Sequence, residues 1–189
     1  MNIMAIWPWL FWGWVAAEAV IAIAMRTRRR AGSLQDRGSQ LLIWVVITIA
    51  IASSDWIQHL APWSIFGGAA WLRPLSLAIM ILGLTIRAVA IATLGKAFSV
   101  NVAIRDEQKM QRSGLYRFVR HPSYLGMEIV FLAIGLHSRN WAALACILGL
   151  PTLALLYRIH VEEAALNQAF GEEYAAYSRV TKRLIPGLF

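Results

Sequence analysis

The sequence predicts an all-α integral membrane protein with about five transmembrane helices. The chain has 189 residues, of which 59% are hydrophobic, and its mean hydropathy is +0.57. The apolar residues fall in blocks of the length that crosses a bilayer. Nine tryptophans, several of them near the ends of these blocks, are typical of interfacial anchors. The net charge of +8 is carried by loops between the blocks, which disfavours a nucleic-acid partner.

Three apolar blocks occupy the N-terminal half of the chain. They cover residues 3–25, residues 41–57 and a segment that starts at Leu72 or Leu75 and ends at Leu94. The first block lacks a basic start, and arginines follow it where a signal peptide has a small-residue cleavage site. We therefore expect it to remain as a membrane helix.

The C-terminal half begins with a long polar connection, Gly95 to His121. Residues 123–136 form a fourth apolar segment, which is too short to cross a bilayer upright. Residues 141–157 form a fifth segment that contains Pro151. Because so few residues separate the two segments, we expect a helical hairpin at about 123–157, followed by amphipathic helices. The sequence thus divides into transmembrane helices in residues 1–94 and a site-bearing region in residues 95–189.

The distribution of charge predicts the orientation in the membrane. Residues 26–40 contain five arginines and one aspartate, and residues 96–120 contain six basic and two acidic residues. Each loop therefore carries a net charge of +4, and the positive-inside rule places both in the cytoplasm. Five spans then put the N-terminus outside and the C-terminus inside. In a bacterium this would be the cell inner membrane.

The stretch Ser113 to Gly126, SGLYRFVRHPSYLG, organises the polar region. Gly114 permits backbone angles that other residues avoid. Pro122 suits the first turn of a helix, so we expect a helix that starts near Ser123. Its N-terminus would suit an anionic group. The polar side chains expected to cluster there are Tyr116, His121, Ser123 and Tyr124.

A second polar motif follows the fifth apolar segment. Arg158 and Glu162 are four residues apart and therefore lie on one helical face, which Leu166 and Phe170 continue. Spacing alone favours an interfacial helix with an ordinary ion pair. The functional alternative is an arginine fork for a substrate carboxylate or phosphate, with Glu162 orienting the fork or binding a cationic cofactor.

Four charged residues lie inside apolar blocks: Glu18, Asp55, Arg87 and Glu128. Charges within a membrane are costly and are expected to face partners or a wet cavity. Arg87 is expected to pair with Asp55 or Glu128, or to line a cavity.

Several kinds of site are disfavoured by what the sequence lacks. The histidines are too dispersed for a metal motif, and the single cysteine, Cys146, lies in an apolar block, so we expect no metal and no internal disulfide. The glycine-rich dinucleotide fingerprint, the phosphate-binding loop and the serine nucleophile motif are also missing.

Two segments together resemble the isoprenylcysteine carboxyl methyltransferase family. They are GKAFSVNVAIRDEQKMQRSGLYRFVRHPSYLG at 95–126 and RIHVEEAALNQAFGEEYAAYSRVTKRLIPGLF at 158–189. Phospholipid N-methyltransferases are wider relatives that share the R-H-P-x-Y-x-G element. The resemblance implies a membrane enzyme that binds S-adenosylmethionine in a cytoplasmic pocket built by the polar loop and the C-terminal helices.

The resemblance also assigns residues. The cofactor positions would be Tyr116, His121, Pro122, Ser123, Tyr124 and Glu162, with upstream contacts at Asn101, Gln108, Lys109, Met110 and Gln111. Arg158 would hold the substrate near the methyl donor, so Arg158 and Glu162 are the expected catalytic pair. The family often has histidine where this chain has Gln108, which makes the upstream contacts less secure.

The resemblance predicts methyl transfer to a carboxylate on a lipid-like acceptor, with S-adenosylhomocysteine as product. A carboxylate is ionised at neutral pH and needs positioning rather than a base. The alternative within enzymes is a phospholipid N-methyltransferase, in which an amine must first lose a proton to a base such as Glu162 or His121. The alternative outside enzymes is a membrane transporter or scaffold, which would not bind the methyl donor.

Overall fold

The structure is a computed structural model that describes residues 5–24, 33–34, 38–62, 70–95, 103–104 and 110–189. Its elements are α1 (Ile6–Ala24), β1 (Ser33–Leu34), α2 (Ser39–Leu60), α3 (Leu72–Leu94), β2 (Ala103–Ile104), the 3-10 helix η5 (Gly114–Arg117), α4 (Pro122–Ser138), α5 (Trp141–Phe170) and α6 (Glu172–Val180). The predicted all-α class is confirmed. Its strands are the two-residue segments β1 and β2, which pair antiparallel in the described part of the chain.

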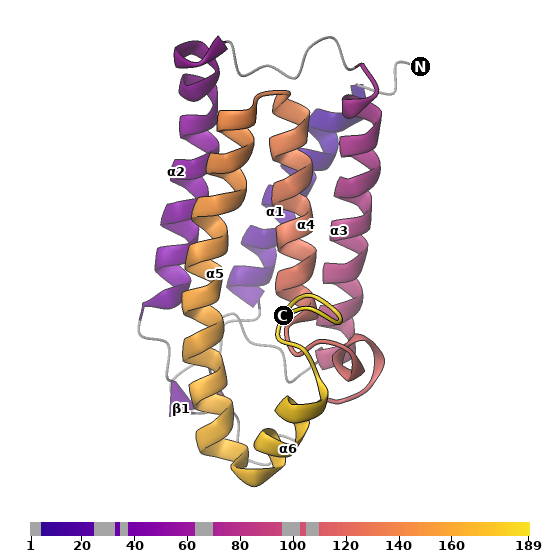
Figure 1. The fold of residues 1–189 in the computed structure, drawn as a ribbon, viewed down its shortest axis with the longest axis vertical. Coiled ribbons are helices and arrows are strands. Elements are labelled where there is room, and N and C mark those ends of the chain that lie inside the picture. Colours follow the sequence, from indigo (N-terminus) through magenta and orange to yellow (C-terminus); the bar gives the residue numbers. More distant parts are fainter. Residues whose placement is uncertain (1–4, 25–32, 35–37, 63–69, 96–102, 105–109) are drawn as a thin grey trace.

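The long helices stand side by side in one bundle (Figure 1). α4 packs between α3 and α5, and α2 packs on the other side of α5. α1 joins through aromatic side chains, among them Trp14, which meets the ring of Phe131 on α4 edge to face. Both residues are buried in the main hydrophobic core.

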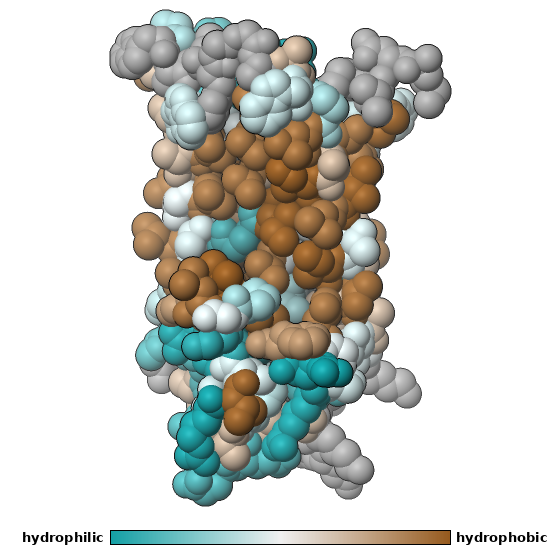
Figure 2. Space-filling model, turned by 45° about the vertical axis from the view of Figure 1, so that its right-hand side comes forward, coloured by the Kyte–Doolittle hydropathy of each residue, from teal (hydrophilic) through white to brown (hydrophobic). Residues whose placement is uncertain are grey.

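Four described helices, α1, α2, α3 and α5, are long and apolar enough to cross a membrane. α4 has 17 residues and is the short member of the bundle, as the sequence predicted. Figure 2 shows apolar side chains around the upper part of the molecule and hydrophilic ones at its lower end. This banding is typical of a protein that spans a bilayer and projects a polar part from one side.

α5 differs from the sequence expectation. The predicted fifth apolar segment and the amphipathic segment after it form one helix of 30 residues, with the buried Pro151 inside it. Membrane helices tolerate internal proline because neighbouring helices can satisfy the freed backbone groups. The helix therefore runs from the apolar segment into the amphipathic segment that carries Arg158 and Glu162, and its last turns extend below the other long helices in Figure 1.

The backbones of α3 and α4 touch at a pair of glycines. A Cβ atom on Gly126 would lie 2.8 Å from the backbone nitrogen of Arg87 and 2.8 Å from the carbonyl oxygen of Gly83. Gly126 is the last residue of the SGLYRFVRHPSYLG motif, and this close approach explains why the position requires glycine. The contact fixes the first turns of α4 against α3.

Candidate functional site

The polar motif forms a short 3-10 helix, a turn and the start of α4. Gly114 has a φ of 59°, which is the left-handed backbone conformation that the sequence suggested. Tyr116 is buried, and its hydroxyl donates to the carbonyl of Ala90 near the end of α3 at 3.3 Å. His121 precedes α4, and Pro122 is the first residue of that helix. The predicted helix start is therefore confirmed to within one residue.

The C-terminal segment pairs with this turn through its backbone. The amide of Arg120 donates to the carbonyl of Lys182 at 2.8 Å, and the amide of His121 donates to the carbonyl of Arg183 at 3.1 Å. The amide of Lys182 donates back to the carbonyl of Phe118 at 3.2 Å. The two segments that carry the family resemblance thus lie side by side.

α6 also contacts the polar motif, through Tyr177. Tyr177 donates its hydroxyl proton to the carbonyl of Tyr116 at 2.6 Å. Burial raises the pKa of Tyr177 to about 12, so the phenol remains protonated and able to donate at neutral pH. Burial also raises the pKa of Tyr116, and the nearby Glu162 carboxylate adds to this.

Glu163 is an ionic anchor that sequence reasoning missed. Its carboxylate accepts from Arg120 Nε at 2.9 Å and lies 2.9 Å from Arg183 Nη2. Its Oε1 is also 3.4 Å from His121 Nε2. Glu163 therefore joins α5 to both the motif turn and the C-terminal segment. Helical spacing indicates that Glu163 points away from the face of Glu162, but it does not identify the partners of Glu163.

Four of the predicted functional residues lie together in one cluster, formed by His121, Tyr124, Arg158 and Glu162. Tyr124 donates its hydroxyl proton to Glu162 Oε2 at 2.8 Å and accepts from Arg158 Nε at 3.0 Å. His121 Nδ1 lies 3.8 Å from the same carboxylate oxygen, and its ring stacks on Tyr124 with centroids 5.6 Å apart. Arg158 is 3% exposed, whereas the Glu162 side chain is 32% exposed. The cluster pairs a buried cation with a carboxylate that is accessible from one side.

Ser39, at the start of α2, completes the setting of Arg158. It accepts a hydrogen bond from Arg158 Nη1 at 2.9 Å and is itself fully buried. The sequence placed this residue in a loop, so its contribution was not expected. The contact spans 119 residues of sequence, and no local pattern signals it.

Of the upstream residues that the resemblance assigned to the cofactor, the structure describes Met110 and Gln111. Asn101, Gln108 and Lys109 lie outside the described residues. Gln111 donates to the carbonyl of Thr93 at 2.7 Å and so ties the loop to the end of α3. Met110 is half-buried just before it.

Arg87 is paired differently from the prediction, which is wrong on this point. The guanidinium donates through Nε and Nη2 to the two carboxylate oxygens of Glu18 on α1, and through Nη1 to Ser123 Oγ at 2.8 Å. Asp55 instead lies exposed beside His59. Glu128 accepts a hydrogen bond from Thr152. Arg87 on α3 therefore links α1 to the first turn of α4.

The chain is similar to proteins of one family. The sequence model of the isoprenylcysteine carboxyl methyltransferase (ICMT) family matches residues 76–168. Protein-S-isoprenylcysteine O-methyltransferase B of Arabidopsis thaliana is 29% identical over 175 residues, covering 90% of this chain and 86% of the plant protein. The protein-S-isoprenylcysteine O-methyltransferase of Rattus norvegicus is 30% identical over 144 residues, covering 72% of this chain and 49% of the rat protein.

A solved structure shares the fold. The eukaryotic intramembrane Ras methyltransferase ICMT superposes with a TM-score of 0.63 at 23% sequence identity, covering 76% of this chain and 52% of that one. At this identity the likeness speaks for the arrangement of the helices.

Proposed function

Because the chain belongs to the isoprenylcysteine carboxyl methyltransferase family and is a membrane carboxyl methyltransferase, we propose that its reaction site is the cluster around Arg158 and Glu162. One observation carries this proposal. His121, which precedes α4, and Tyr124, in the first turn of α4, meet Glu162 and Arg158 of α5 within hydrogen-bonding or ion-pair distance. The two sequence segments that resemble the family thus form one polar group.

The methyl donor that we propose is S-adenosylmethionine. The half-accessible carboxylate of Glu162 and the neighbouring rings of Tyr124 and His121 fit a molecule with a sulfonium and an ammonium group, because anionic and aromatic groups attract cations. The start of α4 at Pro122 is the positive end of the helix dipole, which would suit the donor's carboxylate. When bound, the donor supplies an electrophilic methyl group.

The chain's own contribution to the reaction is to hold and orient the acceptor. Arg158 is fixed by Tyr124 on one side and Ser39 on the other, so its guanidinium is set in one orientation. A planar guanidinium can grip a carboxylate through two parallel hydrogen bonds. An acceptor carboxylate is already ionised at neutral pH, so alignment and partial removal of water are the main requirements. Arg158 meets both requirements in its buried position.

The acceptor class that we propose is a carboxylate on an amphiphilic molecule whose apolar part stays in the bilayer. Arg158 directly follows the apolar segment 141–157 on α5, so such a molecule would reach it with its tail still in lipid. The relatives' names point to a carboxylate on a prenylated cysteine, which is one member of this class. We further propose that the polar end faces the cytoplasm and the N-terminus faces outward, in keeping with the charge of the loops.

The first test is binding of S-adenosylhomocysteine to detergent-purified protein by calorimetry. We expect binding that falls sharply in Tyr116→Ala and His121→Ala. The matched control is His160→Ala, an exposed residue on the same helix as Glu162, which should bind as the unaltered protein does. Normal binding by folded Tyr116→Ala and His121→Ala variants would contradict the assigned site.

The second test is transfer of labelled methyl groups from S-adenosylmethionine to total membrane extract. The label should appear as a methyl ester, from which mild alkali releases volatile labelled methanol. The competing acceptor is a phospholipid amine, whose N-methyl label alkali does not release as methanol and whose methylation rate rises with pH up to the pKa of the amine. A product that releases no labelled methanol would replace the carboxylate acceptor with the amine.

A further inference from the structure

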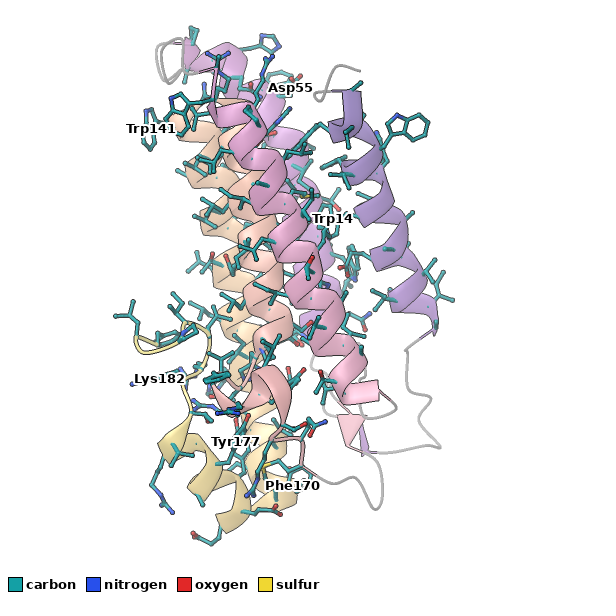
Figure 3. The ribbon with its side chains drawn as sticks, turned by 90° about the vertical axis from the view of Figure 1, so that its right-hand side faces the viewer. Trp14, Asp55, Trp141, Phe170, Tyr177 and Lys182 are labelled. Carbon is teal, nitrogen blue, oxygen red and sulfur yellow. The ribbon has the colours of Figure 1, made fainter. Side chains whose placement is uncertain are left out.

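The C-terminal loop, residues 184–189, lies outside the helix bundle. Its ends are closed by hydrogen bonds from the amides of Leu184 and Ile185 to the carbonyl of Phe189, each 2.7 Å long. In Figure 1 this loop lies in front of the lower turns of the bundle, and in Figure 3 it projects sideways from them. It therefore stands at the level where the apolar band meets the polar end, rather than beneath the bundle.

The surface of this region combines apolar and basic side chains. Phe118 is 55% exposed, Ile185 is 42% exposed and Leu188 is 76% exposed. Arg117 lies over the Phe118 ring at 4.8 Å, and Lys182 is exposed beside it. These five residues are called the interfacial patch. The amide of Lys182 donates to the carbonyl of Phe118, which holds the two halves of the patch together.

The charges of the patch have no carboxylate partner in the described part of the chain. Among the described residues, neither Arg117 nor Lys182 takes part in an ion pair. The neighbouring cation Arg183 differs, because it is paired with Glu163. Exposed apolar side chains beside free cations are typical of surfaces that lie among lipid headgroups, where the former enter the acyl boundary and the latter meet phosphates. Lys182 is seen at the outer side of the bundle in Figure 3.

We propose that the interfacial patch docks on anionic phospholipid headgroups and thereby strengthens binding at the methyl-donor site. The second half of this proposal rests on the proposed function. The link is the backbone pairing, in which Arg183 accepts from the amide of His121 and Lys182 accepts from the amide of Arg120. A loop held by lipid would hold His121 in place beside Glu162, since no flexible segment separates them. By reciprocity, donor binding would also strengthen lipid docking.

The lipid contact can be tested without any assumption about the reaction. Leu188→Cys in a Cys146→Ala background gives a single labelling site, because Cys146 is the only natural cysteine. A polarity-sensitive fluorophore there should shift to the blue in nanodiscs and be quenched by lipids brominated near the headgroup. The control label at Ala176→Cys, an exposed position on α6, should remain unquenched. Equal, water-like emission from both labels would overturn the proposal.

The coupling is tested by S-adenosylhomocysteine affinity in nanodiscs of phosphatidylcholine alone or mixed with phosphatidylglycerol. We expect tighter binding by about fivefold with the anionic lipid, at the lower end of typical coupling between sites. Arg117→Gln and Lys182→Gln should each remove part of this gain, since each basic residue near an anionic surface contributes about fivefold to attraction. Arg73→Gln, an exposed cation at the opposite end of the bundle, should retain the gain.

Three outcomes separate the alternatives. Affinity that is the same in both lipids would overturn the coupling. A gain that inorganic phosphate reproduces in neutral nanodiscs would overturn the assignment to lipid in favour of a free anion. No binding of S-adenosylhomocysteine in either lipid would contradict the proposed function, and the fluorescent label would still decide whether the patch contacts lipid.

Discussion

Breaking the ion pair between Glu18 and Arg87 is expected to cost far more stability than removing it whole. Glu18 is 4% exposed and Arg87 is 8% exposed. Replacing Glu18 with leucine leaves a buried guanidinium with Ser123 as a partner but no counter-charge, which costs about 3–5 kcal/mol in the free energy of unfolding. That is a large share of the about 5–15 kcal/mol that holds a typical domain together.

The double variant should recover most of this loss. Glu18→Leu with Arg87→Met replaces the pair by apolar groups of similar length, which is often neutral or stabilising. It still loses the hydrogen bond to Ser123, worth about 1–2 kcal/mol. Arg87→Met alone should cost about as much as Glu18→Leu alone, because it leaves a buried carboxylate unpaired. With about 3–5 kcal/mol for each single variant and about 1–2 kcal/mol for the double, the double-mutant cycle should give a coupling energy of at least about 4 kcal/mol. The assay is unfolding in mixed micelles, followed by circular dichroism for all four proteins.

The control is Asp55→Asn, which alters the other acid that was expected to pair with Arg87. Asp55 has an 82% exposed side chain, so this change should stay within about 0.5 kcal/mol. A coupling energy below about 0.5 kcal/mol for Glu18 and Arg87 would refute the reasoning, because it would mean that the two residues act independently. A large cost for Asp55→Asn would refute it as well.

Three further predictions concern the site and its support. Arg158→Ala should keep S-adenosylhomocysteine binding within about threefold, while turnover falls about a hundredfold. Arg158→Lys should not restore turnover, because an ammonium group lacks the planar fork of the guanidinium. Normal turnover in Arg158→Ala would show that Arg158 does not hold the substrate. Because the pKa of Tyr177 is raised, the stability that its phenol contributes is present below pH about 10 and is lost as pH rises toward about 12. Tyr177→Phe should abolish this part of the loss of stability at alkaline pH, measured by thermal unfolding scans. An unchanged pH profile would contradict the role of the phenol. Gly126→Ala should destabilise by about 1–3 kcal/mol through overlap with α3, whereas Gly149→Ala, with open space around it, should be neutral or slightly stabilising.

The sequence predicted the parts of the site that depend on local pattern. A proline after a polar turn predicted the start of α4, and the spacing of Arg158 and Glu162 predicted a shared face. The charge of the loops predicted that the motif turn and the C-terminal segment lie at the same end, and their backbones are paired there. Each of these inferences needs only a few neighbouring residues, or a count of charges.

The contacts that the sequence could not predict depend on how the helices are rotated about their axes. Hydropathy marks which segments enter the membrane but not which side of a uniformly apolar helix faces a neighbour. Glu18 and Arg87 are 69 residues apart, and the sequence led us to expect Asp55 or Glu128 as the partner of the arginine. For the same reason, the contact between Ser39 and Arg158 could not be predicted. The continuation of α5 through Pro151 was not predicted either, because packing against neighbouring helices outweighs the usual effect of proline.

The first turn of α4 is held from two sides, and this would fix the residues that we propose as part of the methyl-donor site. From the membrane side, Arg87 binds Ser123 and is itself fixed by Glu18. From the polar side, Glu163 binds Arg120 and lies beside His121. Positioning is the main demand of methyl transfer to a carboxylate, and small displacements of an aligned group are costly to its rate. In the proposed mechanism, the buried pair of Glu18 with Arg87 and the ionic contacts of Glu163 therefore both limit movement of the first turn of α4.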